Sequence, residues 1–380
     1  MKILHVITEL DNMYGAQRHL VECVKDHIIK GHVCKVISGK TGIASAQLSK
    51  KGIEIICIPE LRNSYFILND VKAITKICKE IDDFIPDIVI SHSSKAGIVA
   101  RIACKIKKVP NIFTVHGWSF EKGTPFYQYI TGYIVEYLMK GITDKYFCVS
   151  EHTASFGQKK IGIKRNKILV CPNVHEKREL ANLDNNIYHT VLMVAGFRKQ
   201  KDHRSAIEAM NLIVNGLNRS DIKLTLIGDG PERRNIEKLI SNYNLNEFIT
   251  LAGETTEIDK YYKMCDIVIL PTHYEGLPIA LIESIQNAKP IIATNVSGVS
   301  EIVQDGYNGN LISENDFNAL AVLIVKYYDE NYFNIMGANA LKVYSDKFSY
   351  ESICIKMNNI IDNLSSSSIY NYVHCAKNKK

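Results

Sequence analysis

Short runs of residues rich in isoleucine and valine alternate with longer helical patterns along almost the whole chain. This alternation is typical of βαβ units, in which a helix connects two parallel strands of one sheet. A first series of strands is expected at residues 2–8, 33–38, 53–58, 87–91, 111–115 and 145–149. A second series is expected at residues 190–195, 222–227, 248–251, 266–270 and 290–293. The pattern predicts an α/β protein with two parallel sheets.

The two series of strands predict two domains. At 380 residues the chain is too long for one ordinary core and suits two domains of roughly 150 to 200 residues each. The linker is expected at residues 171–190, which are polar and rich in turn formers. We predict two doubly wound, Rossmann-like domains, residues 1–174 and 175–347, that face each other across a cleft, because such sheets bind ligands at the C-terminal ends of their strands. A helix over 348–366 is expected to pack back on the first domain, followed by a tail over 367–380.

No segment has the composition of a membrane span. The chain is 46% hydrophobic with one tryptophan, and no apolar run reaches the roughly 18 residues that a bilayer requires. Residues 1–10 (MKILHVITEL) are typical of a core strand and lack the cleavage site of a secretory signal. We therefore expect a cytoplasmic protein.

The ten cysteines are scattered along the chain, with no CxxC pair and no histidine cluster near them in sequence. Zinc sites and disulfide frameworks both require a more regular spacing. The spacing therefore predicts reduced cysteines in the cores and no metal ion.

Charge is divided unevenly between the two halves of the chain. Residues 1–175 hold 25 Lys and Arg against 15 Asp and Glu, a net charge of +10, and residues 176–380 hold 21 against 25, a net charge of −4. A basic first half suits the anionic headgroups of a membrane or an acceptor that carries phosphate. Lysines that only solvate the surface would give the same count.

The loops after the strands argue against several nucleotide-binding folds. Gly228 and Gly230 follow a strand, but Arg233 stands where the dehydrogenase fingerprint G-x-G-x-x-G requires a third glycine. No G-x-x-x-x-G-K-[ST] sequence is present, which argues against a P-loop nucleotidase. A DxD motif, which would hold a metal ion on a sugar nucleotide, is also absent from the sequence. A bound diphosphate would have to be neutralised by the protein alone.

Two acids stand eight positions apart around a turn in HYEGLPIALIES, residues 273–284. A helix is expected over 278–288 with Pro278 as its first residue, and the N-terminus of such a helix attracts anions. Because a carboxylate accepts two hydrogen bonds from neighbouring hydroxyls, Glu275 and Glu283 suit a ribose and a hexose on either side of a phosphate. In the alternative interpretation, Glu275 is an exposed loop acid and Glu283 lies on the polar side of an amphipathic helix.

A second loop supplies cations. Arg198, Lys199 and Lys201 follow the strand that opens the second domain, just before another helix. Cations at the C-terminal end of a strand are well placed to bind a diphosphate, although a solvated surface loop is the alternative. Together with the two acids, this loop favours a site for a nucleotide sugar.

These motifs together resemble the retaining glycosyltransferases of family 4, which have the GT-B fold. The resemblance rests on EGLPIALIE, on FRKQKDH after the first strand of the second half, on LIGDGPER and on GVSEIV. It extends to the first half through YGAQRHL, SHSSKAG and TVHGWSF, so it covers almost the whole chain.

For the second domain, the resemblance implies a donor site. Glu283 would bind the ribose of the nucleotide, and Glu275 would contact the transferred sugar. Lys201 and Arg198 would stabilise the diphosphate as it leaves, in place of a metal ion. Further contacts with the sugar, the phosphate and the base would come from Gly276, Leu277, the neighbours of Pro278, Gly253 and Glu254.

For the first domain, the resemblance implies two further contacts. Gly15 would let the N-terminus of a helix approach the phosphates, and His116 would face the sugar from across the cleft, although a lone histidine after a strand is more often structural. The chain departs from the family at two positions. Tyr14 stands where the family often has a glycine, and Gly196 where it often has an arginine, for which Arg198 would substitute.

The implied reaction moves a hexose or N-acetylhexosamine from a nucleoside diphosphate, UDP in the first instance, to an acceptor hydroxyl with retention of the anomeric configuration. Because Glu275 is better explained as a sugar ligand than as a nucleophile, we expect a front-face reaction in which a β-phosphate oxygen accepts the proton of the acceptor. No metal or other cofactor is expected. The expected acceptor is a glycan or a polyprenyl-diphosphate-linked sugar of a surface polysaccharide, and no nucleic acid is expected as a partner.

Residues 127–145 (YQYITGYIVEYLMKGITDK) interleave tyrosines with apolar residues and end in lysines. Such a segment suits a lipid surface at the inner face of the cell membrane, and an ordinary core helix is the alternative. Two other functions also remain open from the sequence. One is a GT-B enzyme with different chemistry, such as a sugar-nucleotide epimerase or a phosphorylase, and the other is a two-lobed sugar-binding protein without catalytic activity.

Overall fold

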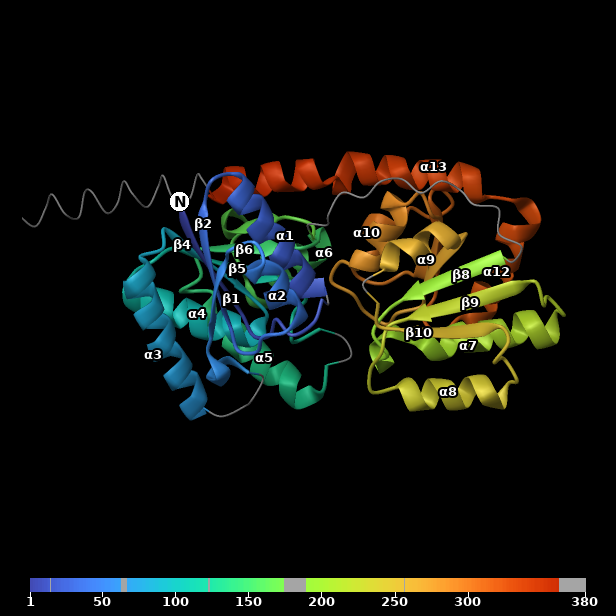
Figure 1. Ribbon diagram of the computed structural model, residues 1–380, viewed down its shortest axis with the longest axis horizontal. Coiled ribbons are helices and arrows are strands. Elements are labelled where there is room, and N and C mark those ends of the chain that lie inside the picture. The colour runs from blue at the N-terminus through green and yellow to red at the C-terminus, as the bar shows by residue number, and fades with distance from the viewer. Residues whose placement is uncertain (14, 63–66, 122–123, 174–188, 256, 362–380) are drawn as a thin grey trace, which may run out of the picture. The chain divides into compact units, whose positions relative to one another are not determined.

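In the computed structural model, two parallel sheets each form the centre of one structural unit (Figure 1). The structure describes residues 1–380 except 14, 63–66, 122–123, 174–188, 256 and 362–380. Of the described residues, 1–173 and 350–361 belong to the first unit, and 189–349 to the second. The boundary expected at 174/175, most of the expected linker and the tail expected over 367–380 lie outside the described residues.

Among the described residues of the first unit, seven parallel strands form a sheet in the order β3-β2-β1-β4-β5-β6-β7. The strands are β1 (Lys2–Ile7), β2 (Val33–Ser38), β3 (Glu54–Cys57), β4 (Ile88–His92), β5 (Asn111–Val115), β6 (Lys145–Cys148) and β7 (Ile168–Val170). The first six lie where the sequence predicted strands. β7 was not predicted, because three residues at the edge of a sheet are too few to give an apolar pattern.

Helices cover both faces of this sheet because its strands are apolar on both sides. Ile3 and Ile7 of β1 pack with α1, whereas Leu4 and Val6 point to the other face and pack with α3 and α4. The helices of this unit are α1 (Gly15–Ile29), α2 (Ile43–Ser49), η1 (Pro59–Leu61), α3 (Ile67–Phe84), α4 (Ser94–Lys107), α5 (Phe126–Met139), α6 (Glu151–Ile161) and η2 (Arg165–Lys167).

The helical residues 350–361 near the end of the chain pack on the first unit. Asn358 donates a hydrogen bond of 2.5 Å to the Asp26 carboxylate of α1. Four side chains of this segment share a core with β1 and α1: Ile353, Cys354, Met357 and Ile361. Burial of these side chains accounts for the helical apolar spacing in the stretch where a helix was expected over 348–366.

Within residues 189–349, six parallel strands form the second sheet, in the order β10-β9-β8-β11-β12-β13. They are β8 (His189–Val194), β9 (Ile222–Ile227), β10 (Ile249–Gly253), β11 (Ile267–Leu270), β12 (Ile291–Thr294) and β13 (Gly309–Ile312). β13 was not predicted, because a glycine and an asparagine occupy half of it. In each sheet, successive strands are added first toward one edge and then toward the other. The direction changes between β1 and β4 in the first sheet and between β8 and β11 in the second. Such switch points are where open α/β sheets bind ligands.

Short helices follow the strands of the second sheet. The helix expected over 278–288 is α10, which begins at Ile279, so Pro278 is the N-cap and not the first helical residue. The helices of this unit are η3 (Lys199–Lys201), α7 (His203–Asn211), η4 (Leu212–Gly216), α8 (Arg233–Asn242), α9 (Ile258–Met264), α10 (Ile279–Gln286), α11 (Val299–Ile302), α12 (Phe317–Glu330), α13 (Phe333–Val343) and η5 (Tyr344–Phe348).

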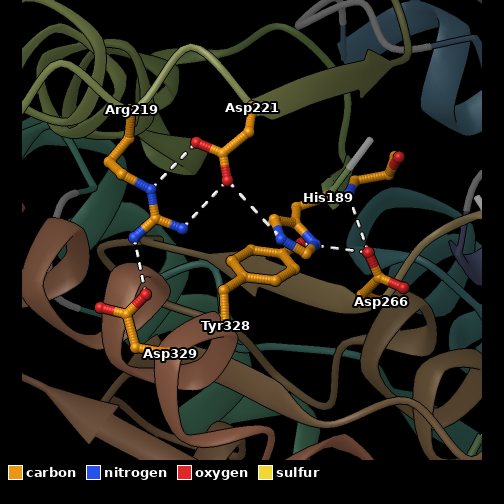
Figure 2. Close-up of polar contacts among 7 residues, drawn as sticks. His189, Arg219, Asp221, Asp266, Tyr328 and Asp329 are labelled. Carbon is orange, nitrogen blue, oxygen red and sulfur yellow. Dashed lines mark hydrogen bonds and ion pairs between the residues drawn. The ribbon is translucent and has the colours of Figure 1, made fainter. Parts of the chain in front are cut away.

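Figure 2 shows polar contacts that connect the second sheet to α12 at the N-terminal ends of the strands. Arg219, just before β9, donates hydrogen bonds to Asp221 at 2.9 and 3.0 Å and to Asp329 of α12 at 2.7 Å. Asp266, just before β11, accepts hydrogen bonds from a backbone N–H of β8 at 2.8 Å and from the Tyr328 hydroxyl at 3.3 Å. These contacts hold three neighbouring strands at the edge opposite to the switch-point loops.

Candidate functional site

The strand order of the second sheet brings two loops together. β8 and β11 are neighbours, so the segments that follow them leave the same edge of the sheet side by side. Gln200 connects the two segments. Its carbonyl oxygen accepts hydrogen bonds from the His273 N–H at 2.9 Å and the Thr272 hydroxyl at 3.0 Å, and its side chain donates to the Tyr274 carbonyl at 2.6 Å.

These hydrogen bonds place Lys201 against Glu275. The two side chains form an ion pair, with 21% of the lysine side chain and 8% of the glutamate side chain exposed. A carboxylate so deeply buried requires a compensating charge, and Lys201 supplies it. Glu275 is therefore not the exposed loop acid of the alternative interpretation. The sequence assigned both residues to one site, and the structure shows that they are direct partners.

Glu283 lies on α10 and is 1% exposed. Its carboxylate accepts a hydrogen bond of 2.9 Å from the Tyr262 hydroxyl of α9, which also lies 2.9 Å from the Ala280 carbonyl oxygen. Glu283 is therefore not on a solvated side of an amphipathic helix. The sequence analysis missed Tyr262, because no spacing in the sequence relates it to α10.

Gly276 and Leu277 connect Glu275 to Pro278, the N-cap of α10. The loop after β12 packs directly on this segment. A Cβ added at Gly298 would stand 1.9 Å from the Gly276 carbonyl oxygen, and the Gly298 N–H donates to the Glu275 carbonyl at 3.4 Å. A glycine is therefore required in the GVSEIV motif. The first turn of α10 carries the backbone N–H groups that make a helix N-terminus an anion site.

Two glycines of LIGDGPER support the cation loop from its other side. Gly228 has a φ of 133°, and a Cβ there would stand 2.2 Å from the Ala195 carbonyl oxygen. Gly230 has a φ of 157°, and a Cβ there would stand 2.6 Å from the Phe197 carbonyl oxygen. The Gly228 N–H in turn donates to the Gly253 carbonyl at 2.9 Å. The loops after β8, β9 and β10 therefore form one continuous layer at this edge of the sheet.

Gly196 and Arg198 lie in the loop just before Lys201. Arg198 is exposed, and its N–H donates to the Gly196 carbonyl at 2.8 Å. A Cβ at Gly196 would have its nearest neighbour, the Asp229 carbonyl oxygen, at 3.7 Å, which is an ordinary contact. Packing therefore does not require a glycine at this position. That Arg198 takes the role of the arginine that the family often has at the position of Gly196 stays a prediction.

In the first unit, the corresponding switch point lies between β1 and β4. The hydroxyls of Thr8 and Ser93, which follow these two strands, form a hydrogen bond. Ser93 has a φ of 71°, a conformation that is uncommon outside glycine and is often found at functional sites. Gly15 begins α1, and Tyr14 lies outside the described residues. Gly15 and the residues that follow it in the motif YGAQRHL thus lie at the same edge of the first sheet as SHSSKAG.

His116 follows β5 and belongs to a row of imidazoles between the first sheet and α1. Its ring centroid lies 5.1 Å from that of His19 and 5.9 Å from that of His92. His5 lies next to His92, and His27 next to His5, at nitrogen–nitrogen distances of 3.3 and 3.2 Å. Burial lowers the pKa of His116 to about 4, so this side chain is neutral at neutral pH. The sequence treated it as a lone histidine, and its expected contact with the sugar stays a prediction.

Glu121 lies in the same loop as His116 and was missed by the sequence analysis. It is 7% exposed, and its carboxylate accepts a hydrogen bond of 3.2 Å from the Trp118 N–H. Burial raises the pKa of Glu121 to about 7, with the hydrogen bond opposing this rise. No sequence signal marks Glu121, because its burial and not its spacing makes it unusual.

Two family models match the chain in succession. One is described as Glycosyltransferase Family 4 and matches residues 13–175, and the other is described as Glycosyl transferases group 1 and matches residues 176–343. The chain belongs to glycosyltransferase family 4. The recognition made from the sequence motifs is therefore confirmed.

Several proteins similar to this glycosyltransferase have assigned roles. An Escherichia coli α-1,3-galactosyltransferase, named for UDP-Gal and α-D-GlcNAc-diphosphoundecaprenol, is 26% identical over 297 residues, 74% of this chain and 76% of that protein. The capsular polysaccharide biosynthesis glycosyltransferase CapM of Staphylococcus aureus is 28% identical over 378 residues, 93% and 94% of the two chains. The crystal structure of Anabaena HepE with UDP and glucose matches with a TM-score of 0.82 at 18% identity, over 95% of this chain and 99% of that chain. The predicted GT-B fold is therefore confirmed.

Replacing Gly298 by alanine should destabilise the second unit, because the new Cβ would overlap the Gly276 carbonyl oxygen. We expect a loss of about 1–3 kcal/mol, the usual cost of overpacking, and a melting temperature lower by at least about 2 °C in differential scanning fluorimetry. Gly196→Ala is the matched control, since its Cβ has room. Equal melting temperatures for the two variants would contradict the packing described here.

Replacing Glu121 by glutamine should stabilise the protein in alkaline but not in acidic solution. The pKa of Glu121 is about 7 in the folded protein, against a value of 4.5 for the exposed group, so its ionisation above pH 7 opposes folding. Below pH 4.5 the carboxyl group is protonated in both states and the difference vanishes. Thermal unfolding at about pH 8.5 should favour the glutamine variant by on the order of 1–3 kcal/mol, with no difference at about pH 4. The same pH dependence in both proteins would show that Glu121 titrates normally.

Proposed function

We propose that this protein is a retaining glycosyltransferase that moves a hexose or N-acetylhexosamine from a UDP-sugar to a hydroxyl group of a glycan or a polyprenyl-diphosphate-linked acceptor. The product would belong to a surface polysaccharide. The Lys201–Glu275 ion pair at the switch point carries this proposal, because it joins the cation that a leaving diphosphate requires to the acid that a sugar requires. The names of the Escherichia coli relative and CapM, and the UDP and glucose in the HepE structure, support these donor and acceptor classes.

Binding of the donor would exchange the partners of the ion pair. The Lys201 ammonium would move from the Glu275 carboxylate to the diphosphate, and the carboxylate would then accept hydrogen bonds from the hydroxyls of the sugar. Each buried charge keeps a partner throughout, which avoids the penalty of about 3–5 kcal/mol for breaking a buried pair. As the bond between sugar and phosphate breaks, negative charge grows on the β-phosphate, and a lysine already in place stabilises it.

The placement of the two acids favours a front-face reaction. With the donor bound, Glu275 would be engaged by the hydroxyls of the sugar, and Glu283 accepts a hydrogen bond from Tyr262, so neither carboxylate would serve as a nucleophile. A β-phosphate oxygen would accept the proton of the acceptor hydroxyl while the acceptor oxygen bonds to C1 on the face that UDP leaves. His116 would contribute a hydrogen bond and not a positive charge, because burial keeps it neutral.

The remaining donor contacts follow from the same edge of the second sheet. Glu283 would accept hydrogen bonds from the ribose, with the Tyr262 hydroxyl fixing the orientation of its carboxylate. Gly253, with a φ of 70° and open space around its Cβ position, would leave room for the base. Arg198 would add a second positive charge at the phosphates, and Gly15 would allow the N-terminus of α1 to approach them.

We also propose that the diphosphate is neutralised without a metal ion. Mg²⁺ and Mn²⁺ take oxygen ligands, chiefly carboxylates. In the exchange described above, Glu275 would turn to the hydroxyls of the sugar, and Glu283 accepts a hydrogen bond from Tyr262, so neither carboxylate would be directed at the diphosphate. Lys201, Arg198 and the N-terminus of α10 would supply the positive charge in place of a metal ion.

α5 has an exposed apolar face that suits a lipid surface. Of its side chains only Glu136 is buried, so α5 is not an ordinary core helix. Among the described residues, no helix has both the length and the apolar character needed to cross a bilayer. We propose that α5 rests on an anionic membrane at the cytoplasmic face, attracted by the net charge of +10 in residues 1–175. The apolar face consists of Phe126, Tyr127, Ile130, Ile134, Tyr137 and Leu138, which are 39–78% exposed.

The proposed reaction predicts that UDP is released from a UDP-hexose or UDP-N-acetylhexosamine only when an acceptor is present. Nuclear magnetic resonance of the product should show an α-linkage from an α-linked donor, because the reaction retains the configuration. UDP should bind with the same Kd in excess EDTA and in excess Mg²⁺, as measured by isothermal titration calorimetry. A β-linked product would contradict the front-face mechanism, and loss of UDP binding in EDTA would contradict neutralisation by the protein.

Lys201→Ala should lower turnover by on the order of 10²-fold or more, which is the size of losing one preorganised electrostatic contact. The matched control is Lys199→Ala, since Lys199 is an exposed lysine of the same short helix. Turnover near the wild-type value in purified Lys201→Ala, with a normal melting temperature, would remove Lys201 from the proposed mechanism.

Membrane contact through α5 predicts that the protein floats with vesicles that contain phosphatidylglycerol and not with vesicles of phosphatidylcholine alone. The double variant Ile134→Glu, Leu138→Glu should lose this binding, because it places two charges on the apolar face. The pair Val322→Glu, Ile335→Glu is the control, since both residues are exposed on helices of the second unit. Equal flotation of both double variants would show that α5 is not the contact surface.

A further inference from the structure

Three side chains from neighbouring elements converge under α1 in the first unit. They are His5 of β1, His27 in the last turn of α1 and Cys34 of β2. All three are buried, and one potential ligand atom of each lies within 4.8 Å of the others. The topology accounts for this convergence, because β1 and β2 are parallel neighbours with Ile3 opposite Cys34, and both of these residues pack in the core beneath α1.

The hydrogen bonds of the imidazoles around His5 cannot all be satisfied. His5 Nε2 lies 3.2 Å from His27 Nδ1, and His5 Nδ1 lies 3.3 Å from His92 Nε2. A neutral imidazole has one N–H and one lone pair, so only two arrangements of protons form both bonds. Either arrangement leaves an N–H at one end and a lone pair at the other, because His27 Nε2 and His92 Nδ1 have no partner. The hydrogen bonds alone therefore do not select one tautomer of His5 or His27.

We propose that His5, His27 and Cys34 bind a divalent metal ion of the zinc class, with a water molecule as the fourth ligand. Two metal–nitrogen bonds of about 2.0–2.1 Å at a tetrahedral angle would place the nitrogens about 3.3 Å apart. His5 Nε2 and His27 Nδ1 already stand 3.2 Å apart. Cys34 Sγ would stand about 3.6 Å from each nitrogen in the bound state, and it already lies within 4.8 Å of a nitrogen of each histidine. Two imidazoles and a thiolate favour Zn²⁺ or Co²⁺ over Mg²⁺ or Ca²⁺.

His92 is not a metal ligand, but it would accept a hydrogen bond from the ligand His5. When His5 Nε2 and His27 Nδ1 direct their lone pairs at the ion, the proton of His5 lies on Nδ1 and is donated to His92 Nε2. Outer hydrogen bonds of this kind fix the tautomer and orientation of ligand histidines. Cys34 binds as the thiolate, and its proton passes to solvent as the metal–sulfur bond forms. The hydrogen bond between His5 and His27 is replaced by two metal–nitrogen bonds.

The ion would tie β1, β2 and the C-terminal end of α1 together. Gly15 begins α1 at the switch-point edge, and His27 lies in its last turn. The ion would therefore anchor the helix at the end away from Gly15. This site concerns the stability of the first unit and does not depend on the proposed transfer reaction. The sequence predicted no metal, because His5 reaches Cys34 only through the pairing of β1 with β2, and the packing of α1 on these strands brings His27 to both.

Co²⁺ is the probe of choice, because it occupies zinc sites and absorbs visible light. The full-length protein is stripped with EDTA, exchanged into metal-free buffer and titrated with Co²⁺. We expect one equivalent to bind with the visible bands of tetrahedral Co²⁺ and a near-ultraviolet band of thiolate-to-cobalt charge transfer, both displaced by Zn²⁺. Zn²⁺ should also raise the melting temperature, since it binds the folded state.

Variants identify the ligands. Cys34→Ala should lose the charge-transfer band, whereas Cys171→Ala, which removes another buried cysteine of the same core, should keep it. His27→Gln should weaken Co²⁺ binding by at least about tenfold. Far-ultraviolet circular dichroism of the metal-free variants establishes that they are folded. Absence of Co²⁺ binding to the wild type, or a charge-transfer band that survives in folded Cys34→Ala, would overturn the proposal and leave a row of hydrogen-bonded imidazoles.

Discussion

The reversal of strand order between β8 and β11 is the constraint on which the candidate site depends. Lys201 and Glu275 are 74 positions apart in sequence, and they meet because the loops after these two strands leave neighbouring positions at one edge of the sheet. The surrounding loops then fix the pair. Gln200 bonds one loop to the other, and the close approaches of Gly228 and Gly298 to neighbouring carbonyl oxygens leave both loops little freedom to move. The ion pair is thus a consequence of topology, and a small set of glycines makes it rigid.

A lysine ammonium that is paired with a carboxylate differs in its solvation and position from one that is fully hydrated. Lys201 is desolvated in part before any ligand arrives, and Glu275 keeps it at the switch point. An incoming diphosphate would carry more negative charge than the carboxylate and compete for the same ammonium. The released Glu275 carboxylate would then lie beside the ligand as a hydrogen-bond acceptor. It would accept hydrogen bonds from hydroxyl groups and repel a second phosphate, because both groups are anions. One exchange of partners would therefore select for a ligand that joins a diphosphate to a polyol.

Most of the fold was predictable from the sequence, because eleven of the strands in the described residues are apolar runs long enough to be recognised. β7 and β13 were missed because edge strands of three and four residues carry little pattern. The acids and cations of the site were found through their motifs, but their contacts were not. The Lys201–Glu275 and Glu283–Tyr262 contacts depend on strand order and helix packing. Neither can be predicted from the spacing of residues in the local sequence. Glu121 and the imidazole row escaped notice for the same reason, since burial alone makes them unusual.

The two units share a topology but handle charge in opposite ways. The second unit places an ion pair at its switch point, whereas the first unit lines the space under α1 with neutral imidazoles and places a hydroxyl pair at its own switch point. The net charge of +10 in residues 1–175 is consequently a property of the surface of the first unit, where it acts over a distance on anionic lipid or phosphate. The imidazoles under α1 add no positive charge, because burial keeps His116, His19 and His92 unprotonated, and the buried Arg101 of α4 is already paired with Glu136. In the proposed reaction the developing charge would therefore be stabilised within the second unit, by Lys201 and its loop.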